Sequence, residues 1–338
     1  MRDRPTLQDV AERAGVSRAL VSIVMRDAPG ASAETRVRVR KAADEMGYRP
    51  DARARMLRSQ RTKLLGVVFT PGQEFHAGLI DGVYLAAEAR GYDVVMSCVT
   101  AHRNERRALR TLLDDRCEAL ILIGSELPIR DLVDVDSRLP VVALARKASK
   151  VDSVRSDDAF GAALAVEHLG GLGHRAIVHL DGGRAPGAAE RRNGFRKAGK
   201  AAGIAATILA GGLTEREGAG AATALLAAPD PLPTAVFAFN DRCALGLIDV
   251  LIRAGSRVPD EVSVVGFDDS PLAGLAHVDL TTIGQDSARL ADLAVARAVD
   301  RIEGIEGPAS TTIDAVCDPH LVVRGSTAPP RQVPMTVH

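Results

Sequence analysis

Apolar and polar residues alternate with a helical period at the start of the chain. One face of the expected helix is formed by Leu7, Val10, Ala11 and Ala14. Thr6 and Asp9 stand at the spacing of a capping box, in which each side chain bonds a free N–H of the first turn. Gly15 can take the left-handed conformation in which many helices end. The pattern therefore predicts a helix between Thr6 and Gly15.

Two more helices are predicted in the next thirty or so residues. Ser17 can cap a helix that continues to Met25, and Ser32 can cap a helix that ends at Gly47. The first two helices are joined by a turn that contains Gly15, which is the arrangement of a helix-turn-helix unit. We expect residues 1–49 to form this all-helical unit and residues 50–62, rich in arginine, to form a separate hinge segment.

The remainder of the chain, residues 63–326, alternates short β-branched runs with helical stretches, which is typical of parallel sheets covered by helices. The expected strands are residues 64–69, 93–98, 119–123, 141–144, 177–180, 235–239 and 262–267, and the expected helices are 77–90, 103–115, 159–172, 194–202, 216–227 and 244–254. Two such series predict an α/β domain of two doubly wound lobes. Ligands in this architecture bind at the carboxyl ends of strands, here between the lobes.

Composition places the chain among globular proteins. Its residues are 46% hydrophobic and 25% charged, as in ordinary globular proteins. A chain of 338 residues is longer than a single hydrophobic core usually organises, so at least two domains are expected. The apolar runs are too short to cross a bilayer, and the start of the sequence does not have the form of a secretory signal, so we expect a cytoplasmic protein with no membrane partner. The cysteines, Cys98, Cys117, Cys243 and Cys317, lack zinc-ligand spacing and are expected to be reduced thiols without a metal.

The formal net charge is zero, but it is distributed unevenly along the chain. Residues 1–61 contain 14 Lys and Arg against 8 Asp and Glu, which leaves this segment at +6 and the remainder at −6. A small basic unit attached to a larger acidic body indicates that the first part meets phosphate and that the second does not.

The helical unit also carries a specific pattern of residues. The pattern comprises Thr6, Asp9-Val10-Ala11, Ala14-Gly15-Val16-Ser17, Val21-Ser22, Val24, residues 32–36, Gly47-Tyr48-Arg49-Pro50, Ala54-Arg55 and Leu57. It resembles the headpiece of the lactose-repressor (LacI) family of transcriptional regulators. The resemblance implies that residues 17–25 form a recognition helix in the major groove, where the fork of Arg18 fits a guanine edge. Leu20, Ile23 and Arg26 depart from the family, so the operator sequence cannot be transferred from a relative.

The resemblance implies a set of DNA-contacting residues in both segments. They are Thr6, Ser17, Arg18, Ala19, Leu20, Ser22, Arg26, Arg36 and Tyr48 in the helical unit, and Arg53, Ala54, Arg55, Leu57 and Arg58 in the hinge. In this family the hinge becomes helical when two copies meet on DNA, and a leucine, here Leu57, enters the minor groove. The alternative is a flexible basic linker in which Leu57 has no such role.

Family motifs continue through the two-lobed body, whose layout resembles that of a periplasmic sugar-binding protein. They include Ser156-Asp157-Asp158, Glu167-His168-Leu169, Leu172-Gly173-His174-Arg175, Arg191-x-x-Gly194-Phe195, Asn240-Asp241, Gly266-Phe267-Asp268-Asp269, residues 280–283 and Gln285. The resemblance implies effector hydrogen bonds from Arg191, Asn240, Asp268 and Gln285. The alternatives are a surface arginine at a helix start, a helix cap for Asn240 and a turn for Asp268 with Asp269.

Aromatic residues make up only 3% of the chain, so few rings can stack on a sugar face. The family often has Asn-Pro-Phe-Phe after the first strand of the body, whereas residues 72–76 here are Gly-Gln-Glu-Phe-His. Phe75, His76 and Phe239 are the remaining candidates for the effector site. The expected effector is a sugar or a related polar metabolite, not necessarily a simple hexose. His168 and His174 lie among apolar residues and are expected to be structural.

These observations favour a DNA-binding regulator, most simply a repressor, that binds a pseudo-palindromic operator as a homodimer and responds to a small molecule. An enzyme is the rival class, but the sequence lacks a dinucleotide fingerprint, a P-loop and a nucleophile elbow, so we expect neither catalysis nor a cofactor. A free sugar-binding transport protein is the second rival class. It would need export, and the start of the sequence and its basic first segment argue against this. The lobes are expected at residues 63–157 with 287–317, and 158–286 with 318–326, followed by a disordered tail, 327–338, that lacks a leucine heptad for tetramers.

Overall fold

The computed structural model describes residues 5–25, 27–48, 61–305 and 312–331. Its internal contacts divide the chain into two units, Met1–Thr62 and Lys63–His338. Several candidate DNA-contacting residues, namely Arg26, Arg53, Ala54, Arg55, Leu57 and Arg58, lie outside the described residues. Within the described part of the chain, no helix is both long enough and apolar enough to cross a lipid bilayer.

In its described residues the first unit contains three helices, as the sequence predicts: α1 (Leu7–Ala14), α2 (Arg18–Met25) and α3 (Ala33–Met46). The Thr6 hydroxyl accepts a hydrogen bond from the Asp9 N–H at 3.3 Å, and the Asp9 carboxylate accepts one from the Thr6 N–H at 2.6 Å. Gly15 and Gly47 end α1 and α3 with φ angles of 61° and 64°. A small core of aliphatic side chains joins the three helices; it includes Val10, Ala11, Val21, Val24 and Val39.

The second unit begins with a lobe built on a parallel sheet of six strands in the order β11-β5-β4-β3-β1-β2. The strands are β1 (Leu64–Phe69), β2 (Asp93–Cys98), β3 (Ala119–Ile123), β4 (Val141–Leu144), β5 (Asp152–Ser156) and β11 (Asp314–Cys317). The helices of this lobe are α5 (Glu74–Ala89), α6 (Glu105–Asp114), α7 (Ile129–Asp136) and α12 (Ser287–Glu303). Strands β3 and β4 are buried along their whole length, so the sheet is the core of the lobe.

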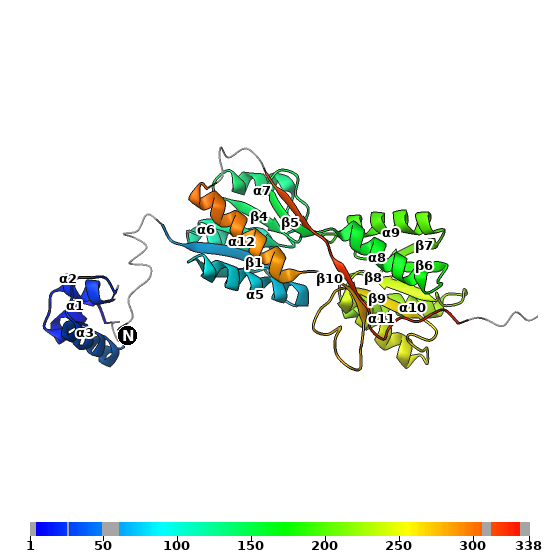
Figure 1. Ribbon diagram of the computed structural model, residues 1–338, viewed down its shortest axis with the longest axis horizontal. Coiled ribbons are helices and arrows are strands. Elements are labelled where there is room, and N and C mark those ends of the chain that lie inside the picture. Colours follow the sequence, from blue (N-terminus) through cyan, green and yellow to red (C-terminus); the bar gives the residue numbers. More distant parts are fainter. Residues whose placement is uncertain (1–4, 26, 49–60, 306–311, 332–338) are drawn as a thin grey trace, which may run out of the picture. The chain divides into compact units, whose positions relative to one another are not determined.

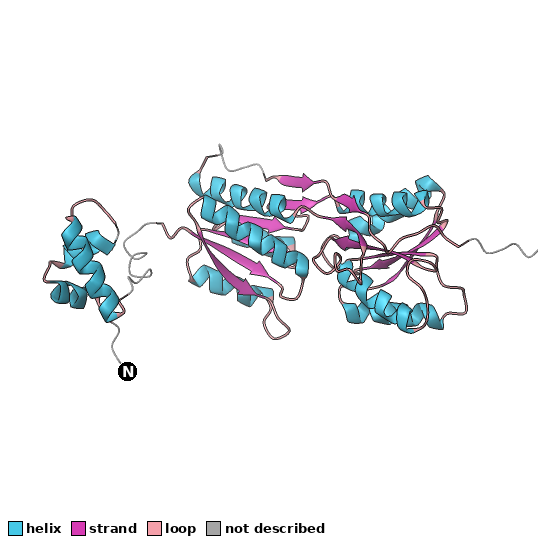
Figure 2. Ribbon diagram, turned by 60° about the horizontal axis from the view of Figure 1, so that its bottom comes forward, coloured by secondary structure: helices cyan, strands magenta, loops and turns pink. Residues whose placement is uncertain are grey.

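The other lobe has a second six-stranded sheet, in the order β12-β10-β9-β8-β6-β7, with β12 antiparallel to β10. Its strands are β6 (Ala176–Asp181), β7 (Ala205–Ala210), β8 (Ala235–Ala238), β9 (Ser263–Asp268), β10 (Thr281–Gly284) and β12 (His320–Val322). Its helices are α8 (Asp158–Gly171), α9 (Ala188–Ala202), α10 (Glu215–Ala227) and α11 (Asp241–Arg253). Figure 2 shows the helices of both lobes on the faces of their sheets.

The chain passes between the lobes three times. It crosses from β5 to α8, returns from β10 to α12, and crosses again between β11 and β12. Figure 1 shows these segments side by side where the two lobes meet. Because β1, β3, β5, β8 and β9 are parallel strands, their carboxyl ends collect polar residues at the sheet edges that line the space between the lobes.

The C-terminal segment differs from the expectation of a tail that is disordered from residue 327. The Thr327 hydroxyl lies 3.0 Å from His168 Nε2, and the Ala328 carbonyl oxygen lies 3.0 Å from His174 Nε2 and accepts from the Ser263 hydroxyl at 2.9 Å. These bonds attach residues 327 and 328 to the second lobe, because His174 and Ser263 are buried and need partners. His168 and His174 therefore have the structural role that the sequence indicates.

Candidate functional site

The amino-terminal end of α2 forms an exposed surface on the three-helix unit. Ser17, Arg18 and Ala19 are exposed, whereas Val21 and Val24 on the opposite face are buried in the core. The Ser17 hydroxyl accepts a hydrogen bond from the Leu20 N–H at 3.2 Å, so this serine caps α2. The helix therefore directs the Arg18 guanidinium away from the core, where it can reach a groove of DNA.

Arg36, which the resemblance implies as a DNA-contacting residue, is partly buried and bonds other residues of the helical unit. Its side chain is 21% exposed, donates to the Asp27 carboxylate at 2.9 Å and also donates to the carbonyl oxygen of Ala28. Arg40 pairs with the same carboxylate at 2.8 Å. Arg36 therefore holds the turn between α2 and α3, and Tyr48 packs partly against the core of the same unit.

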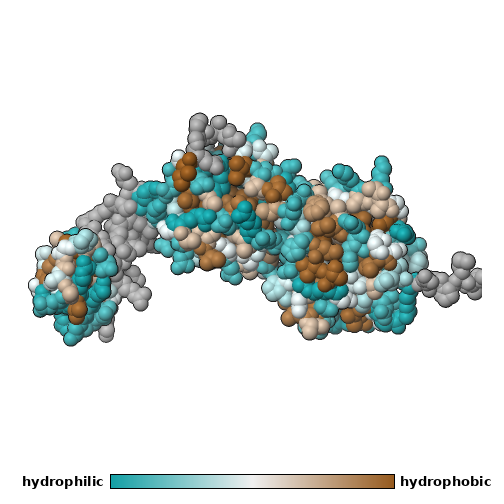
Figure 3. All heavy atoms as spheres, in the orientation of Figure 1, coloured by the Kyte–Doolittle hydropathy of each residue, from teal (hydrophilic) through white to brown (hydrophobic). Residues whose placement is uncertain are grey.

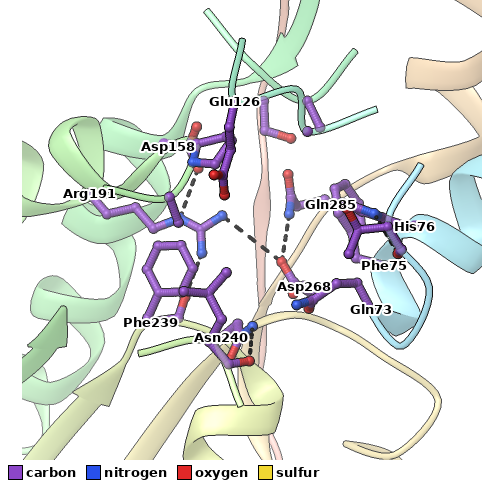
Figure 4. A pocket seen from close by; sticks show the side chains of 17 residues that line it. Gln73, Phe75, His76, Glu126, Asp158, Arg191, Phe239, Asn240, Asp268 and Gln285 are labelled. Atoms are coloured by element: carbon purple, nitrogen blue, oxygen red, sulfur yellow. Dashed lines mark hydrogen bonds and ion pairs between the residues drawn. The ribbon is translucent and has the colours of Figure 1, made fainter. Parts of the chain in front are cut away.

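A cavity of about 120 Å³ lies between the two lobes of the second unit. Its lining includes the seven candidate effector residues, Phe75, His76, Arg191, Phe239, Asn240, Asp268 and Gln285. It also includes residues that the sequence reasoning did not select, among them Thr70, Gln73, Glu126, Ser156 and Asp158. Figure 4 shows side chains from both lobes directed toward this space.

Arg191, in the first turn of α9, lies at the centre of one wall. Its Nε donates to Asp158 Oδ1 at 2.8 Å, and one terminal nitrogen donates to the carbonyl oxygen of Phe239 (Figure 4). The guanidinium carbon lies 4.5 Å from the ring centre of Phe239 and 3.5 Å from that of Phe267. Two rings and a carboxylate thus fix the guanidinium of Arg191, a residue that is 6% exposed, which excludes the alternative of a surface arginine.

The remaining terminal nitrogen of Arg191 points toward Asp268, whose carboxylate lies 4.0 Å away. Gln285 Nε2 donates to Asp268 Oδ1 at 2.7 Å. Burial raises the pKa of Asp268 well above its usual range, against the opposing effect of the Arg191 charge. A carboxyl group held in its protonated form can donate a hydrogen bond as well as accept one.

The turn that carries Asp268 is held in an uncommon conformation. Asp268 has a φ of 113° and Asp269 a φ of 52°, values that cost free energy for residues other than glycine. Buried Asp241 compensates, because its carboxylate accepts from the Ser270 N–H at 2.7 Å and from the Thr282 hydroxyl at 2.5 Å. Asp241 thus ties α11 and β10 to the turn, and it acts as a positioning residue for Asp268.

Asn240 has the alternative role that the sequence left open. Its Oδ1 accepts from the Cys243 N–H at 2.9 Å and so caps α11, and its Nδ2 donates to the Leu213 carbonyl at 3.1 Å. Both polar atoms are therefore engaged within the second lobe. Asn240 shapes the wall of the cavity more than it offers free hydrogen-bonding groups.

The aromatic candidates at the entrance are largely committed to the protein. Phe75 packs against the core of the first lobe, and Phe239 is covered by the Arg191 guanidinium. His76 Nδ1 lies 3.2 Å from the Thr70 carbonyl oxygen, and burial lowers the pKa of the imidazole. His76 thus contributes a neutral ring to the wall.

Asp158 is the most important site residue that the sequence reasoning missed. It is buried at the first position of α8, directly after the crossover from β5, and its carboxylate forms the ion pair with Arg191. Glu126 follows β3 in the same manner. For both residues the sequence offered one signal, a polar residue shortly after the end of a buried strand. In doubly wound sheets this position marks the ligand-binding edge.

Comparison with known proteins agrees with this architecture. Residues 6–51 match the model of the bacterial regulatory proteins of the lacI family, and residues 166–327 match that of a periplasmic binding protein-like domain. The chain is 33% identical over 312 residues to the HTH-type transcriptional repressor PurR of Vibrio vulnificus, an alignment that covers 89% of this chain and 93% of PurR.

Two solved structures extend the comparison. A LacI transcriptional regulator from a Rhodococcus species shares 47% identity and a TM-score of 0.73, over 79% of this chain and 98% of that one. The lac repressor dimer bound to operator and the anti-inducer ONPF shares 29% identity and a TM-score of 0.83, over 96% of this chain and all of that one. The chain therefore belongs to the lacI family of bacterial regulatory proteins, as a DNA-binding transcriptional regulator with a periplasmic-binding-protein-like domain.

Proposed function

We propose that the protein is a cytoplasmic repressor that binds a pseudo-palindromic operator as a homodimer, and that a neutral, hydroxyl-rich small molecule in the interlobe cavity controls this binding. The observation that carries the proposal is the joint presence of an exposed recognition helix in one unit and a polar cavity with a fixed guanidinium in the other.

The DNA-binding part rests on the exposed end of α2 and the excess of basic residues in residues 1–61. Arg18 is the residue that we assign to a base edge, because its fork can bond guanine in a bidentate manner. Ser17, Ala19, Leu20 and Ser22 belong to the same helix or its cap, and Thr6 caps α1. These residues remain proposed contacts, together with Tyr48 and those of the hinge. Arg36 is proposed only as a residue that positions the recognition helix.

Homodimer formation is supported by apolar side chains on the surface of the second unit. Figure 3 shows apolar patches on the visible face of both lobes. The exposed large hydrophobic residues of the second unit include Tyr84 and Leu85 on α5 and Ile252 on α11, with exposed fractions of 43%, 72% and 55%. Large exposed apolar patches mark interaction sites in globular proteins, and the related lac repressor was solved as a dimer on its operator.

The charge of the cavity selects the chemical class of the effector. Its lining contains the carboxyl groups of Glu126, Asp158 and Asp268 and one guanidinium, that of Arg191, which is already hydrogen-bonded. Such a wall offers acceptors to hydroxyl donors and repels carboxylates and phosphates. A related regulator, CelR, 30% identical with a TM-score of 0.70, was solved as a complex with cellobiose.

The DNA-binding proposal is tested by selecting operators from fragmented genomic DNA with the purified full chain. We expect a two-fold symmetric site whose affinity falls by orders of magnitude between low and moderate salt, because several phosphate contacts release counterions. Arg18→Ala should weaken binding at least about tenfold and relax the preference at one base pair. Arg13→Ala removes an exposed arginine that pairs with Glu45 and serves as the control. Binding that is insensitive to salt, or equal for all sequences, would overturn the proposal.

The effector proposal is tested by screening sugars and polyols for release of the selected operator. Arg191→Ala should abolish the response, because it removes the group that orients Asp158 and Asp268. Arg196→Ala removes an exposed arginine from the same helix and should leave the response intact. Unchanged ligand affinity and unchanged operator release in Arg191→Ala would show that the cavity is not the effector site.

A further inference from the structure

A second cavity in the first lobe adjoins the interlobe cavity. It has a volume of about 490 Å³, and its lining includes Thr70, Thr100, Glu105, Arg106, Gly124 and Glu126. Thr70, Gly124 and Glu126 line both cavities, so these residues form a common wall. The second cavity lies at the carboxyl ends of β1, β2 and β3 and at the start of α6. A ligand that extends past these three shared residues would occupy both cavities.

The partly buried carboxylate of Glu105 is the polar group that indicates a ligand-binding site in this cavity. Its Oε2 accepts from the Glu126 N–H at 3.1 Å, whereas its Oε1 is buried and has no hydrogen-bond partner in the described part of the chain. Burial raises the pKa of this carboxyl group, against the opposing effects of the Ser125 hydroxyl and the Glu126 N–H. A buried acceptor without a donor is costly, and a hydroxyl group of a ligand would satisfy it.

The cations near the second cavity are engaged with the protein. Arg106 donates to the Asp131 carboxylate at 3.0 and 2.5 Å. Arg146 donates to the carbonyl oxygens of Ser125 and Leu127 at 2.7 and 2.6 Å, which fixes the loop beneath the cavity. The lining therefore presents carboxylate acceptors and aliphatic walls. It suits a neutral hydroxylated group and disfavours an anion.

The volumes of the two cavities distinguish a ligand with one sugar ring from a ligand with two. The interlobe cavity, at about 120 Å³, is smaller than typical ligand pockets, which range from roughly 300 to 1,000 Å³, whereas the adjoining cavity, at about 490 Å³, falls within that range. We propose that the second cavity is a subsite for the distal unit of a neutral disaccharide or glycoside, and that a hydroxyl of this unit donates to Glu105 Oε1. The inference rests on the proposed effector role of the interlobe cavity and extends it.

The test is calorimetric titration of the full chain with cellobiose, maltose and lactose, and with their component sugars glucose and galactose. At least one disaccharide should bind about tenfold more tightly than its components. Glu105→Gln should remove most of this advantage and leave the affinity for the monosaccharide unchanged. Glu167→Gln, which neutralises an exposed carboxylate on α8, is the matched control and should behave as the unaltered protein.

A second variant tests the volume of the subsite and not its charge. Thr100→Phe places a ring at an exposed position of the lining and should likewise abolish the disaccharide advantage, while thermal unfolding confirms that the variant is folded. The subsite is overturned if monosaccharides bind, require Arg191, and bind as tightly as every disaccharide, an outcome that leaves the proposed function standing. If a disaccharide binds more tightly but neither Glu105→Gln nor Thr100→Phe affects it, the subsite is also overturned. Absence of binding by all five sugars contradicts the subsite and the sugar-like effector together.

Discussion

Arg242, on α11 of the second lobe, reaches across to Glu74 at the start of α5 in the first lobe, with 3.7 Å between Arg242 Nε and Glu74 Oε2. The same guanidinium donates to the carbonyl oxygen of Gly72 and forms two bonds to the Glu215 carboxylate, at 2.8 and 2.5 Å. Glu215 thus orients Arg242, and Arg242 connects the two lobes beside the entrance of the cavity. The cavity is lined by Gln73, between the two residues of the first lobe that Arg242 contacts.

The first prediction is that Arg242→Gln favours an open arrangement of the lobes. Without the bridge, the residues around Gly72 lose a partner, so amide hydrogen exchange of residues 71–76 should become faster. The apparent affinity for an effector should fall about tenfold, because the closed state is populated less often. Arg253→Gln changes an exposed arginine of α11 that pairs with Asp249 of the same helix, and exchange and affinity should stay unchanged. Equal exchange rates in both variants would show that Arg242 does not hold the lobes together.

The second prediction concerns the close packing of α10 against α11. A methyl group on Gly246 would lie 1.9 Å from the Glu215 carbonyl oxygen, and one on Gly218 would lie 2.0 Å from that of Cys243. Gly246→Ala must therefore push the helices apart, and we expect a loss of at least about 2 kcal/mol in the free energy of unfolding. The shift also moves Glu215, so the two hydrogen bonds that orient Arg242 should weaken.

Gly220 on the same helix pair is the matched control for Gly246. A methyl group there would meet no atom within 4 Å. Gly220→Ala should therefore stabilise α10 by about 0.5 to 1 kcal/mol, because alanine loses less backbone entropy in a helix. Urea unfolding of the two variants measures both effects. Equal stabilities for Gly246→Ala and the unaltered protein would contradict the packing argument.

Elements whose signals are local could be predicted from the sequence. The helices α1, α2 and α3 begin and end at the expected caps, since Thr6, Ser17 and Ser32 each satisfy an N–H of the turn that follows them. The strands β1, β3 and β4 were likewise evident from apolar, β-branched runs, because strands buried on both faces are apolar throughout.

Elements that depend on distant partners were missed. The edge strand β7 is largely exposed and has no continuous apolar run, and β12 has only three residues. Helix α12 buries a face made of small residues such as Ala291 and Ala294 against the first lobe, far away in sequence. In the same way Asp158 becomes a site residue only because α9 brings Arg191 to it, and Arg36 turns inward only because Asp27 lies within reach.

The third prediction is a pH dependence that Asp268 contributes to stability. Its pKa is raised in the folded protein, so above about pH 4 the unfolded chain releases this proton while the folded chain retains it. The contribution of Asp268 is therefore fully favourable below about pH 4 and is lost as the pH rises toward its folded pKa. Asp268→Asn removes the proton, and the stability of this variant relative to the unaltered protein should increase with pH, by up to about 1.4 kcal/mol per pH unit.

Urea unfolding between pH 5 and 7.5 measures this difference. The subtraction cancels the opposite slope of the buried histidines, among them His179, whose pKa burial lowers to about 4. Asp249→Asn, at an exposed carboxylate on α11, is the control for the loss of a surface carboxylate and is measured over the same range. If the Arg191 charge instead held Asp268 ionised in the folded protein, the stability difference between Asp268→Asn and the unaltered protein would not vary with pH in this range, and the prediction would be wrong.

The fourth prediction tests Asp241 as the residue that positions the turn at Asp268. Asp241→Asn places an amide hydrogen opposite either the Ser270 N–H or the Thr282 hydroxyl, both of which donate to the carboxylate. We expect a loss of about 1 to 3 kcal/mol in the free energy of unfolding. Thr282→Val removes one of the two donors, so the double variant should lose less than the sum of the single losses, with a coupling of at least about 0.5 kcal/mol in urea unfolding at pH 7. Strict additivity would mean that Asp241 does not act through the bond to Thr282, and the turn would then have to hold its left-handed conformation by other contacts.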